Sequence, residues 1–130
     1  MGRSCCLVMS TQSGRKSFLI VDDEPIVRME LAEVVRECGY EPWEAGSTAE
    51  ALGILERAGD AFSGLITDIN MPGTRNGMVL ANHVRFIWPH IKIVVVSAGR
   101  KPFSGEMPDN ARFVPKPWNE DLLTSAIALN

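Results

Sequence analysis

Several features are scarce in this sequence, and each scarcity excludes a class of protein. Only three cysteines occur in 130 residues, with no C-x-x-C pair, so we expect no disulfide framework and a reducing, cytoplasmic location. Each apolar run spans only a few residues, which is too short for a membrane-crossing helix. An excess of positive charge is also missing: the net charge is −3, which argues against nucleic-acid binding as the main role.

The rest of the composition is that of an ordinary globular protein, with 45% hydrophobic and 22% charged residues. The length is sufficient for one domain with one core. Residues 1–16 are rich in Ser, Gly and Arg and show no apolar period, so we expect a disordered N-terminal leader followed by a domain over residues 17–130. The first six residues resemble an acylation start, but Cys6 stands where that motif requires Ser or Thr.

Short apolar runs alternate with helical patterns from Ser17 onward. Five of these runs predict strands, because they are continuously apolar or rich in β-branched residues. They lie at 18–21, 40–45, 64–67, 91–96 and 111–114. Pro42 weakens the second of these strands and indicates an edge or near-edge position. Helical patterns follow each of the first three strands and also follow Asn119, so the fold class is α/β: a doubly wound, five-stranded parallel sheet with helices on both faces.

Two helices carry more specific expectations. The helix that begins at Pro25 has an apolar stripe, which we expect to face the core, at Ile26, Met29, Leu31, Val34 and Val35. The segment 98–110, where a fourth helix belongs, contains two prolines and two glycines. Such a segment predicts a short or irregular helix.

Polar residues stand at the C-terminal ends of four predicted strands, where ligands bind in sheets of this kind. Asp22 and Asp23 follow the first strand, Asp68 the third, Ser97 the fourth, and Lys116 the fifth. Each residue alone is weak evidence, because an acid after a strand more often caps a turn or a helix, and a single Ser or Lys there is usually structural or solvated. Their occurrence at successive strand ends predicts one shared site.

Three carboxylates in one place raise each other's pKa, and a hard divalent cation removes that conflict. Mg²⁺ suits such oxygen ligands, and Mn²⁺ or Ca²⁺ can take its place. With the cation and Lys116 neutralising phosphoryl oxygens and Ser97 donating a hydrogen bond to them, Asp68 would be able to attack phosphorus.

Three runs resemble the signatures of bacterial two-component response-regulator receiver domains, in particular the stand-alone, chemotaxis-Y-like kind. They are FLIVDDEP at 18–25, LITDINMP at 65–72 and VPKP at 114–117, and the resemblance extends over about residues 17–130. It implies a flavodoxin-like sheet with strand order 2-1-3-4-5. The turn after Asp68 is one residue longer than in the commonest receivers, and the segment between Ser97 and Lys116 is a few residues shorter.

The resemblance also assigns roles to individual residues. Asp68 becomes the phosphoacceptor, Asp22, Asp23 and Asp68 become metal ligands, and Asn70 lends its backbone carbonyl to the metal. Ser97 takes the position of the switch hydroxyl, Lys116 that of the phosphate-binding lysine, and Phe113 that of the aromatic switch residue. From the residues alone, Phe113 is equally well a core phenylalanine of the fifth strand.

The expected function is a phosphoacceptor switch in two-component or phosphorelay signalling. The implied phosphodonor is a sensor histidine kinase or a histidine phosphotransfer protein, and the implied target is a further protein that the sequence does not identify. Such a protein catalyses its own phosphorylation and dephosphorylation without being a turnover enzyme, and it is a monomer or a phosphorylation-dependent dimer.

Two alternatives belong to other classes. One is a binding module that works without phosphorylation and keeps the pocket as a relic. The other is a phosphohydrolase of the haloacid dehalogenase type, but that chemistry calls for a D-x-D pattern on the first strand and a cap insertion, whereas here the acids are adjacent.

Overall fold

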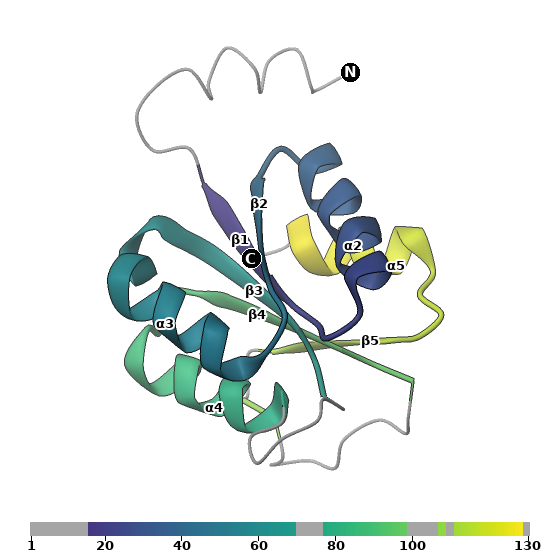
Figure 1. Ribbon diagram of the computed structural model, residues 1–130. Coiled ribbons are helices and arrows are strands. Elements are labelled where there is room, and N and C mark those ends of the chain that lie inside the picture. The colour runs from purple at the N-terminus through teal and green to yellow at the C-terminus, as the bar shows by residue number, and fades with distance from the viewer. Residues whose placement is uncertain (1–15, 70–76, 99–106, 109–110, 129–130) are drawn as a thin grey trace.

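The sheet has five parallel strands in the order β2-β1-β3-β4-β5 (Figure 1). The computed structural model describes residues 16–69, 77–98, 107–108 and 111–128. The strands are β1 (Ser17–Val21), β2 (Glu41–Ala45), β3 (Phe62–Asp68), β4 (Lys92–Ser97) and β5 (Arg112–Pro115). The predicted fold class and strand order are confirmed, and β2 lies at an edge, as Pro42 indicated.

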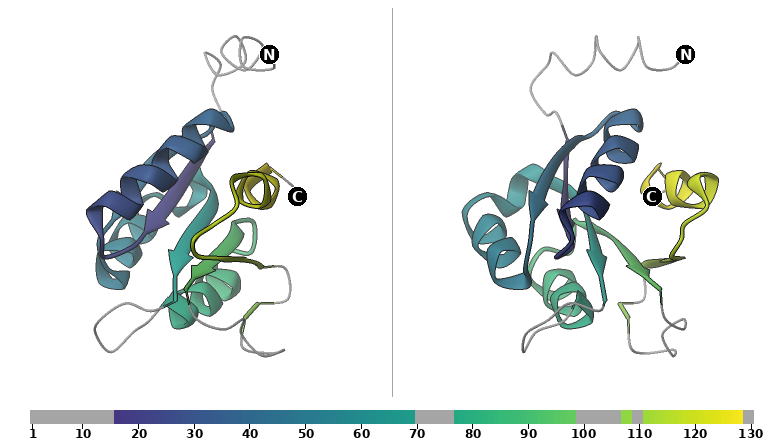
Figure 2. Two further views of the ribbon diagram at one scale, coloured as in Figure 1. Left: turned by 90° about the vertical axis from the view of Figure 1, so that its right-hand side faces the viewer. Right: turned by 45° about the vertical axis from the view of Figure 1, so that its right-hand side comes forward.

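Helices cover both faces of the sheet (Figures 1 and 2). They are α2 (Pro25–Glu37), α3 (Thr48–Ala58), α4 (Gly77–Ile87) and α5 (Glu120–Ala128), with a short 3₁₀ turn, η1 (Gly59–Ala61), after α3. Side chains from α2 and α5 pack on one face of the sheet, and side chains from α3 and α4 pack on the other.

Strand β1 shows why both faces are covered. Its side chains alternate between the two cores: Phe18 and Ile20 join the cluster beneath α2 and α5, while Leu19 and Val21 join the cluster beneath α3 and α4. All four are fully buried. Because successive strand residues point to opposite faces, a continuous apolar run is what a strand between two helix layers requires.

The apolar face of α2 differs from the predicted stripe. Leu31, Val34 and Val35 are buried as expected, but Ile26 and Met29 are 69% and 62% exposed. The buried positions follow a helical row that includes the half-buried Val27, and Ile26 and Met29 lie outside that row. The prediction that these two residues face the core was therefore wrong.

Strand β3 begins two residues earlier than predicted, at Phe62. Phe62 and Ser63 belong to the strand, ahead of Gly64, which the sequence predicted as its first residue. A side chain at Gly64 would collide with the ring of Phe18, so the glycine makes room for that ring. Tertiary packing therefore explains why a glycine occupies this position inside the strand.

Two predictions fall mostly on residues outside the described part of the chain. Of the leader, only Lys16 is described, and of the segment expected to hold the irregular fourth helix, only Ala98, Met107 and Pro108 are described. Both stay predictions. Among the described residues, no helix combines the length and apolar character needed to cross a membrane.

Candidate functional site

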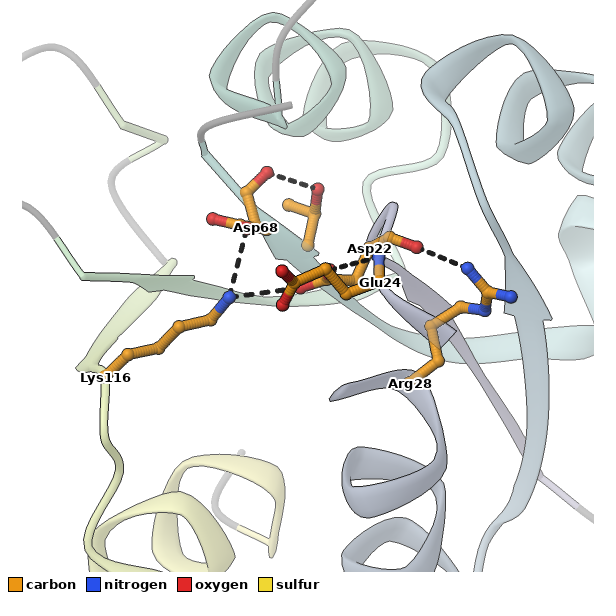
Figure 3. Close-up of polar contacts among 6 residues, drawn as sticks. Asp22, Glu24, Arg28, Asp68 and Lys116 are labelled. Atoms are coloured by element: carbon orange, nitrogen blue, oxygen red, sulfur yellow. Dashed lines mark hydrogen bonds and ion pairs between the residues drawn. The ribbon is translucent and has the colours of Figure 1, made fainter. Parts of the chain in front are cut away.

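The C-terminal ends of β1, β3 and β5 bring three of the predicted residues into direct contact. Asp22 follows β1, Asp68 is the last residue of β3, and Lys116 follows β5. Figure 3 shows the Lys116 side chain reaching between the two carboxylates. Its Nζ donates to Asp68 Oδ2 at 3.0 Å and to Asp22 Oδ2 at 3.2 Å.

All three of these side chains are largely removed from solvent. The exposed fractions are 1% for the Asp22 side chain, 10% for Asp68 and 17% for Lys116. Burial alone lowers the pKa of Lys116, but the hydrogen bond and negative charge of Asp68, and then those of Asp22, outweigh it. The pKa of Lys116 therefore lies above its ordinary value, and its ammonium form is secured.

Asp22 is held from several sides. Its side-chain Oδ1 accepts from the backbone N–H of Glu24 at 2.9 Å, and its own N–H donates to the Ala45 carbonyl at 3.2 Å. Its backbone carbonyl accepts from Arg28 Nη1 at 2.7 Å. These bonds fix both the carboxylate and the main chain of the residue.

Asp23 completes an acidic cluster with Asp22 and Asp68. Each residue offers a carboxylate oxygen, and these oxygens lie within 4.8 Å of one another. With Lys116 as the bonded cation, the four side chains keep two uncompensated negative charges. An oxygen donor set with this charge fits a hard divalent cation such as Mg²⁺. Asn70, the fourth predicted ligand, lies outside the described residues.

Ser97 and Phe113 lie on β4 and β5, the two strands that follow β3 across the sheet. Ser97 ends β4 and is 1% exposed, and its backbone carbonyl accepts from the Lys116 N–H at 2.9 Å. Phe113 pairs in register with Val95 and packs, half-buried, against the core beneath α3 and α4. The peptide bond between Lys116 and Pro117 is cis.

Two residues near the site were not predicted from the sequence. Gly77 begins α4 directly against Asp68: a Cβ there would collide with the Asp68 carbonyl oxygen, and the Gly77 N–H donates to the Ile69 carbonyl at 3.0 Å. The sequence feature that could have identified Gly77 is a glycine at the first position of a predicted helix, immediately after a predicted turn. Arg28 carried no signal, since an arginine in a helix is usually a solvated surface residue.

A groove of about 690 Å³ opens beside Lys116, between α2 and the segment that joins β5 to α5. Its walls combine apolar side chains, among them Val27, Val34 and Trp118, with four glutamates. The glutamates are Glu30, Glu33, Glu37 and Glu120. A molecule that approaches Lys116 through this groove therefore meets glutamate carboxylates and apolar side chains.

Comparison with known proteins gives a consistent result. The family model described as "Response regulator receiver domain" matches residues 18–128. The chain is 33% identical over 118 residues to the sensor kinase CckA of Brucella abortus, which covers 88% of this chain and 12% of that protein. It is 34% identical over 84 residues to the chemotaxis protein CheY of Thermotoga maritima, covering 64% of this chain and 68% of CheY.

Solved structures agree in fold. The response regulator TrrA of Thermotoga maritima, solved in complex with Mg²⁺-BeF, is 33% identical with a TM-score of 0.74, over 86% of this chain and 96% of that one. A response regulator receiver protein from Sinorhizobium medicae has a TM-score of 0.80 at 24% identity, over 87% and 91% of the two chains, and shows the fold alone.

Proposed function

The chain belongs to the response regulator receiver domain family, and from this premise we propose that it is a phosphoacceptor switch that takes a phosphoryl group onto Asp68 from a phosphohistidine donor. A receiver of two-component signalling implies a histidine kinase as partner. One observation carries the proposal: a single partly buried ammonium, that of Lys116, is bonded to both Asp68 and Asp22, beside the exposed Asp23. The site therefore has a carboxylate nucleophile and a fixed positive charge in contact.

The proposed transfer is a displacement at phosphorus. An Asp68 carboxylate oxygen forms the new bond to phosphorus, the phosphorus–nitrogen bond of the donor breaks, and the electron pair stays on the donor imidazole. Lys116, already within hydrogen-bond distance of Asp68 Oδ2, would donate to a phosphoryl oxygen and stabilise its charge. Mg²⁺, when bound by the acidic cluster, supplies further neutralisation of that charge. Attack of water on phosphorus later breaks the bond to the Asp68 oxygen, releases inorganic phosphate and returns Asp68 to its free carboxylate form.

Ser97 and Phe113 are the proposed switch residues. Ser97 stands one position beyond the residue of β4 that pairs with Asp68, and its backbone is bonded to Lys116. Phe113 lies three residues before Lys116 on β5 and is half-buried. A shift of the Ser97 hydroxyl toward a phosphoryl group would therefore act on a neighbouring strand that carries a half-buried aromatic side chain.

The acidic groove beside Lys116 indicates the surface charge of the donor. Its glutamates favour a contacting surface that is positively charged, because complementary charge speeds encounter and fixes orientation. A phosphohistidine donor with basic residues around its histidine would suit this approach.

The test uses the protein with Mg²⁺ and either acetyl phosphate or beryllofluoride. We expect a stoichiometric gain of the mass of one phosphoryl group with the first. With the second we expect a change in tryptophan fluorescence from Trp118, which lines the groove together with Lys116. Asp68→Asn should abolish both responses, because the amide is not a nucleophile. Asp60→Asn removes an exposed acid from η1, just before the other end of β3, and should leave both intact.

Other outcomes separate the alternatives. Absence of both responses in the wild-type protein would contradict the phosphoacceptor proposal and favour a binding module with a relic pocket. Sustained release of phosphate from many phosphate esters would favour a hydrolase. Loss of the fluorescence response in Trp118→Phe, with phosphorylation retained, would assign the signal to that residue.

A further inference from the structure

Arg28, in the first turns of α2, bridges two elements that end at the site. Its Nη1 donates to the Asp22 backbone carbonyl at 2.7 Å, and its Nε donates to Glu44 Oε1 on β2 at 3.1 Å. Only 19% of its side chain is exposed. Figure 3 shows the contact with Asp22 on the side of that residue away from Lys116.

The surroundings of Arg28 define the orientation of its guanidinium group. A Cβ added to Gly46, just after β2, would lie 3.3 Å from Nη1, so the guanidinium packs closely against the chain there. Glu44 fixes the Nε side of the group, which leaves Nη1 directed at the Asp22 carbonyl. The planar fork of arginine suits two acceptors on separate elements, whereas a lysine ammonium is a point charge without a fork.

The bonded carbonyl belongs to the peptide group that joins Asp22 to Asp23. A peptide group is planar, so fixing the direction of its carbonyl also fixes where the Asp23 backbone begins. Asp22 is buried and further held by Lys116 and by the Glu24 N–H, but Asp23 is exposed. The hydrogen bond from Arg28 thus restricts the backbone of Asp23, the residue of the acidic cluster that is most exposed to solvent.

We propose that Arg28 is a positioning residue that, supported by Glu44, holds the Asp22–Asp23 peptide so that both carboxylates face one divalent cation. The inference rests on the proposed function, since it concerns the cation of that same site. It assigns a role in the site to a residue of α2 and a residue of the edge strand β2, neither of which belongs to the acidic cluster itself.

The sign of the effect on cation binding distinguishes this role from simple electrostatics. Arg28 carries a positive charge, so its removal should strengthen Mg²⁺ binding if charge alone matters. If Arg28 positions the ligands, its removal should weaken binding instead. Outer partners of metal ligands typically contribute roughly 10- to 100-fold to metal affinity.

The experiment measures the Mg²⁺ dissociation constant by isothermal titration calorimetry for the full chain and its variants. We expect Arg28→Ala to raise the constant roughly 10-fold or more and Arg28→Lys to give an intermediate value. Arg36→Ala is the matched control: it removes an arginine from the same helix, where Arg36 pairs with the exposed Glu33, and should leave the constant unchanged. Urea denaturation without Mg²⁺ measures the stability of each variant separately.

Arg28→Lys keeps the test open if Arg28→Ala does not fold, because it retains the positive charge without the fork for two acceptors and should still weaken Mg²⁺ binding. Glu44→Ala leaves Arg28 in place but removes the acceptor of its Nε, so Mg²⁺ binding should weaken in the same direction. The double variant should bind no more weakly than Arg28→Ala alone, because the two residues act as one unit. Fully additive losses would contradict the role of Glu44.

Failure of the two proposals can be told apart. If the wild-type protein binds neither Mg²⁺ nor beryllofluoride, the proposed function fails. If the wild type binds Mg²⁺ and Arg28→Ala binds it equally well or more tightly, the positioning role of Arg28 is wrong, even where that variant is less stable.

Discussion

At the scale of single residues, the balance of charge at the site depends on Lys116. Two buried carboxylates share its ammonium group, and without it they would be left as neighbouring buried anions. Removing one partner of a buried ion pair typically costs about 3–5 kcal/mol, because the remaining charge is uncompensated. The same bonds place the ammonium where phosphoryl oxygens would arrive, so one residue serves both stability and the proposed chemistry.

Cys38 is a second residue whose surroundings set its chemistry. It follows α2, is half-buried and packs against the core beneath α2 and α5. Burial, followed by the negative charge of Glu37, raises its pKa above the ordinary value of 9.0, and Lys92 opposes the shift only in part. The neutral thiol is therefore the favoured form in the folded protein.

Alkylation of this thiol with iodoacetamide should show the shift. We use a variant in which Cys5 and Cys6 are replaced by serine. The pH at which the alkylation rate is half-maximal should lie above 9.0 in the folded protein and near 9.0 in the protein unfolded in urea. The raised pKa also means that the contribution of this thiol to folding stability does not change below pH 9.0 and falls as the pH rises from there toward the folded-state pKa. Equal midpoints for the folded and unfolded protein would contradict this prediction.

At the scale of elements, the starts of the helices show how the sequence and the fold share control. Ser47 caps α3 by accepting from the Glu50 N–H at 3.1 Å, and Asn119 precedes α5 and accepts from the Leu122 N–H at 3.0 Å. Both caps could be predicted, because capping uses short polar side chains close in sequence to the N–H groups they satisfy. The first residue of α4 is different, since Gly77 lies against the Asp68 backbone of another element.

Gly77→Ala tests the contact between α4 and β3. The added methyl group would collide with the Asp68 carbonyl oxygen, so we expect a loss of about 1–3 kcal/mol in unfolding free energy together with slower phosphorylation by acetyl phosphate. Urea denaturation and mass spectrometry measure the two effects.

Gly53→Ala is the matched control for Gly77→Ala. A Cβ at Gly53, on α3, would meet only the Arg57 guanidinium, at an ordinary 3.7 Å. The same substitution there should stabilise the protein by about 0.5–1 kcal/mol, because alanine favours a helix over glycine, and should leave phosphorylation unchanged. If both variants behaved alike, the close approach of Gly77 to Asp68 would have no consequence for the site.

At the scale of the whole molecule, the site exists only when the sheet is assembled. Neighbouring residues of β3 show the arrangement: Leu65 packs beneath α3 and α4, and Ile66 packs beneath α2 and α5. Both cores must form before the ends of β1, β3 and β5 meet. The unfolded chain therefore cannot present the acidic cluster as one set of ligands.

This coupling predicts that Mg²⁺ stabilises the folded protein. A cation that binds only the folded state should add about 2.7 kcal/mol at a concentration 100 times its dissociation constant, seen as a rise in melting temperature that EDTA reverses. Asp23→Asn removes an exposed ligand, so it should reduce this rise while changing the stability without Mg²⁺ only slightly. A rise of the same size in Asp23→Asn would exclude that residue as a ligand.

The sequence by itself determined the elements and the edge at which the polar residues gather. Apolar periods identified the strands and helices, Pro42 indicated the edge strand, and the strand ends pointed to Asp22, Asp68 and Lys116. These features are local, or they follow from the rule that parallel strands end at a common edge.

The tertiary structure alone decided which partners each of these residues has. The Lys116 ammonium joins side chains 94 and 48 positions away, and Arg28 reaches a glutamate 16 positions away on another element. The exposure of Ile26 and Met29 and the contact of Gly77 with Asp68 likewise depend on how helices are seated on the sheet. Such contacts arise from packing between distant segments, which no local pattern of residues encodes.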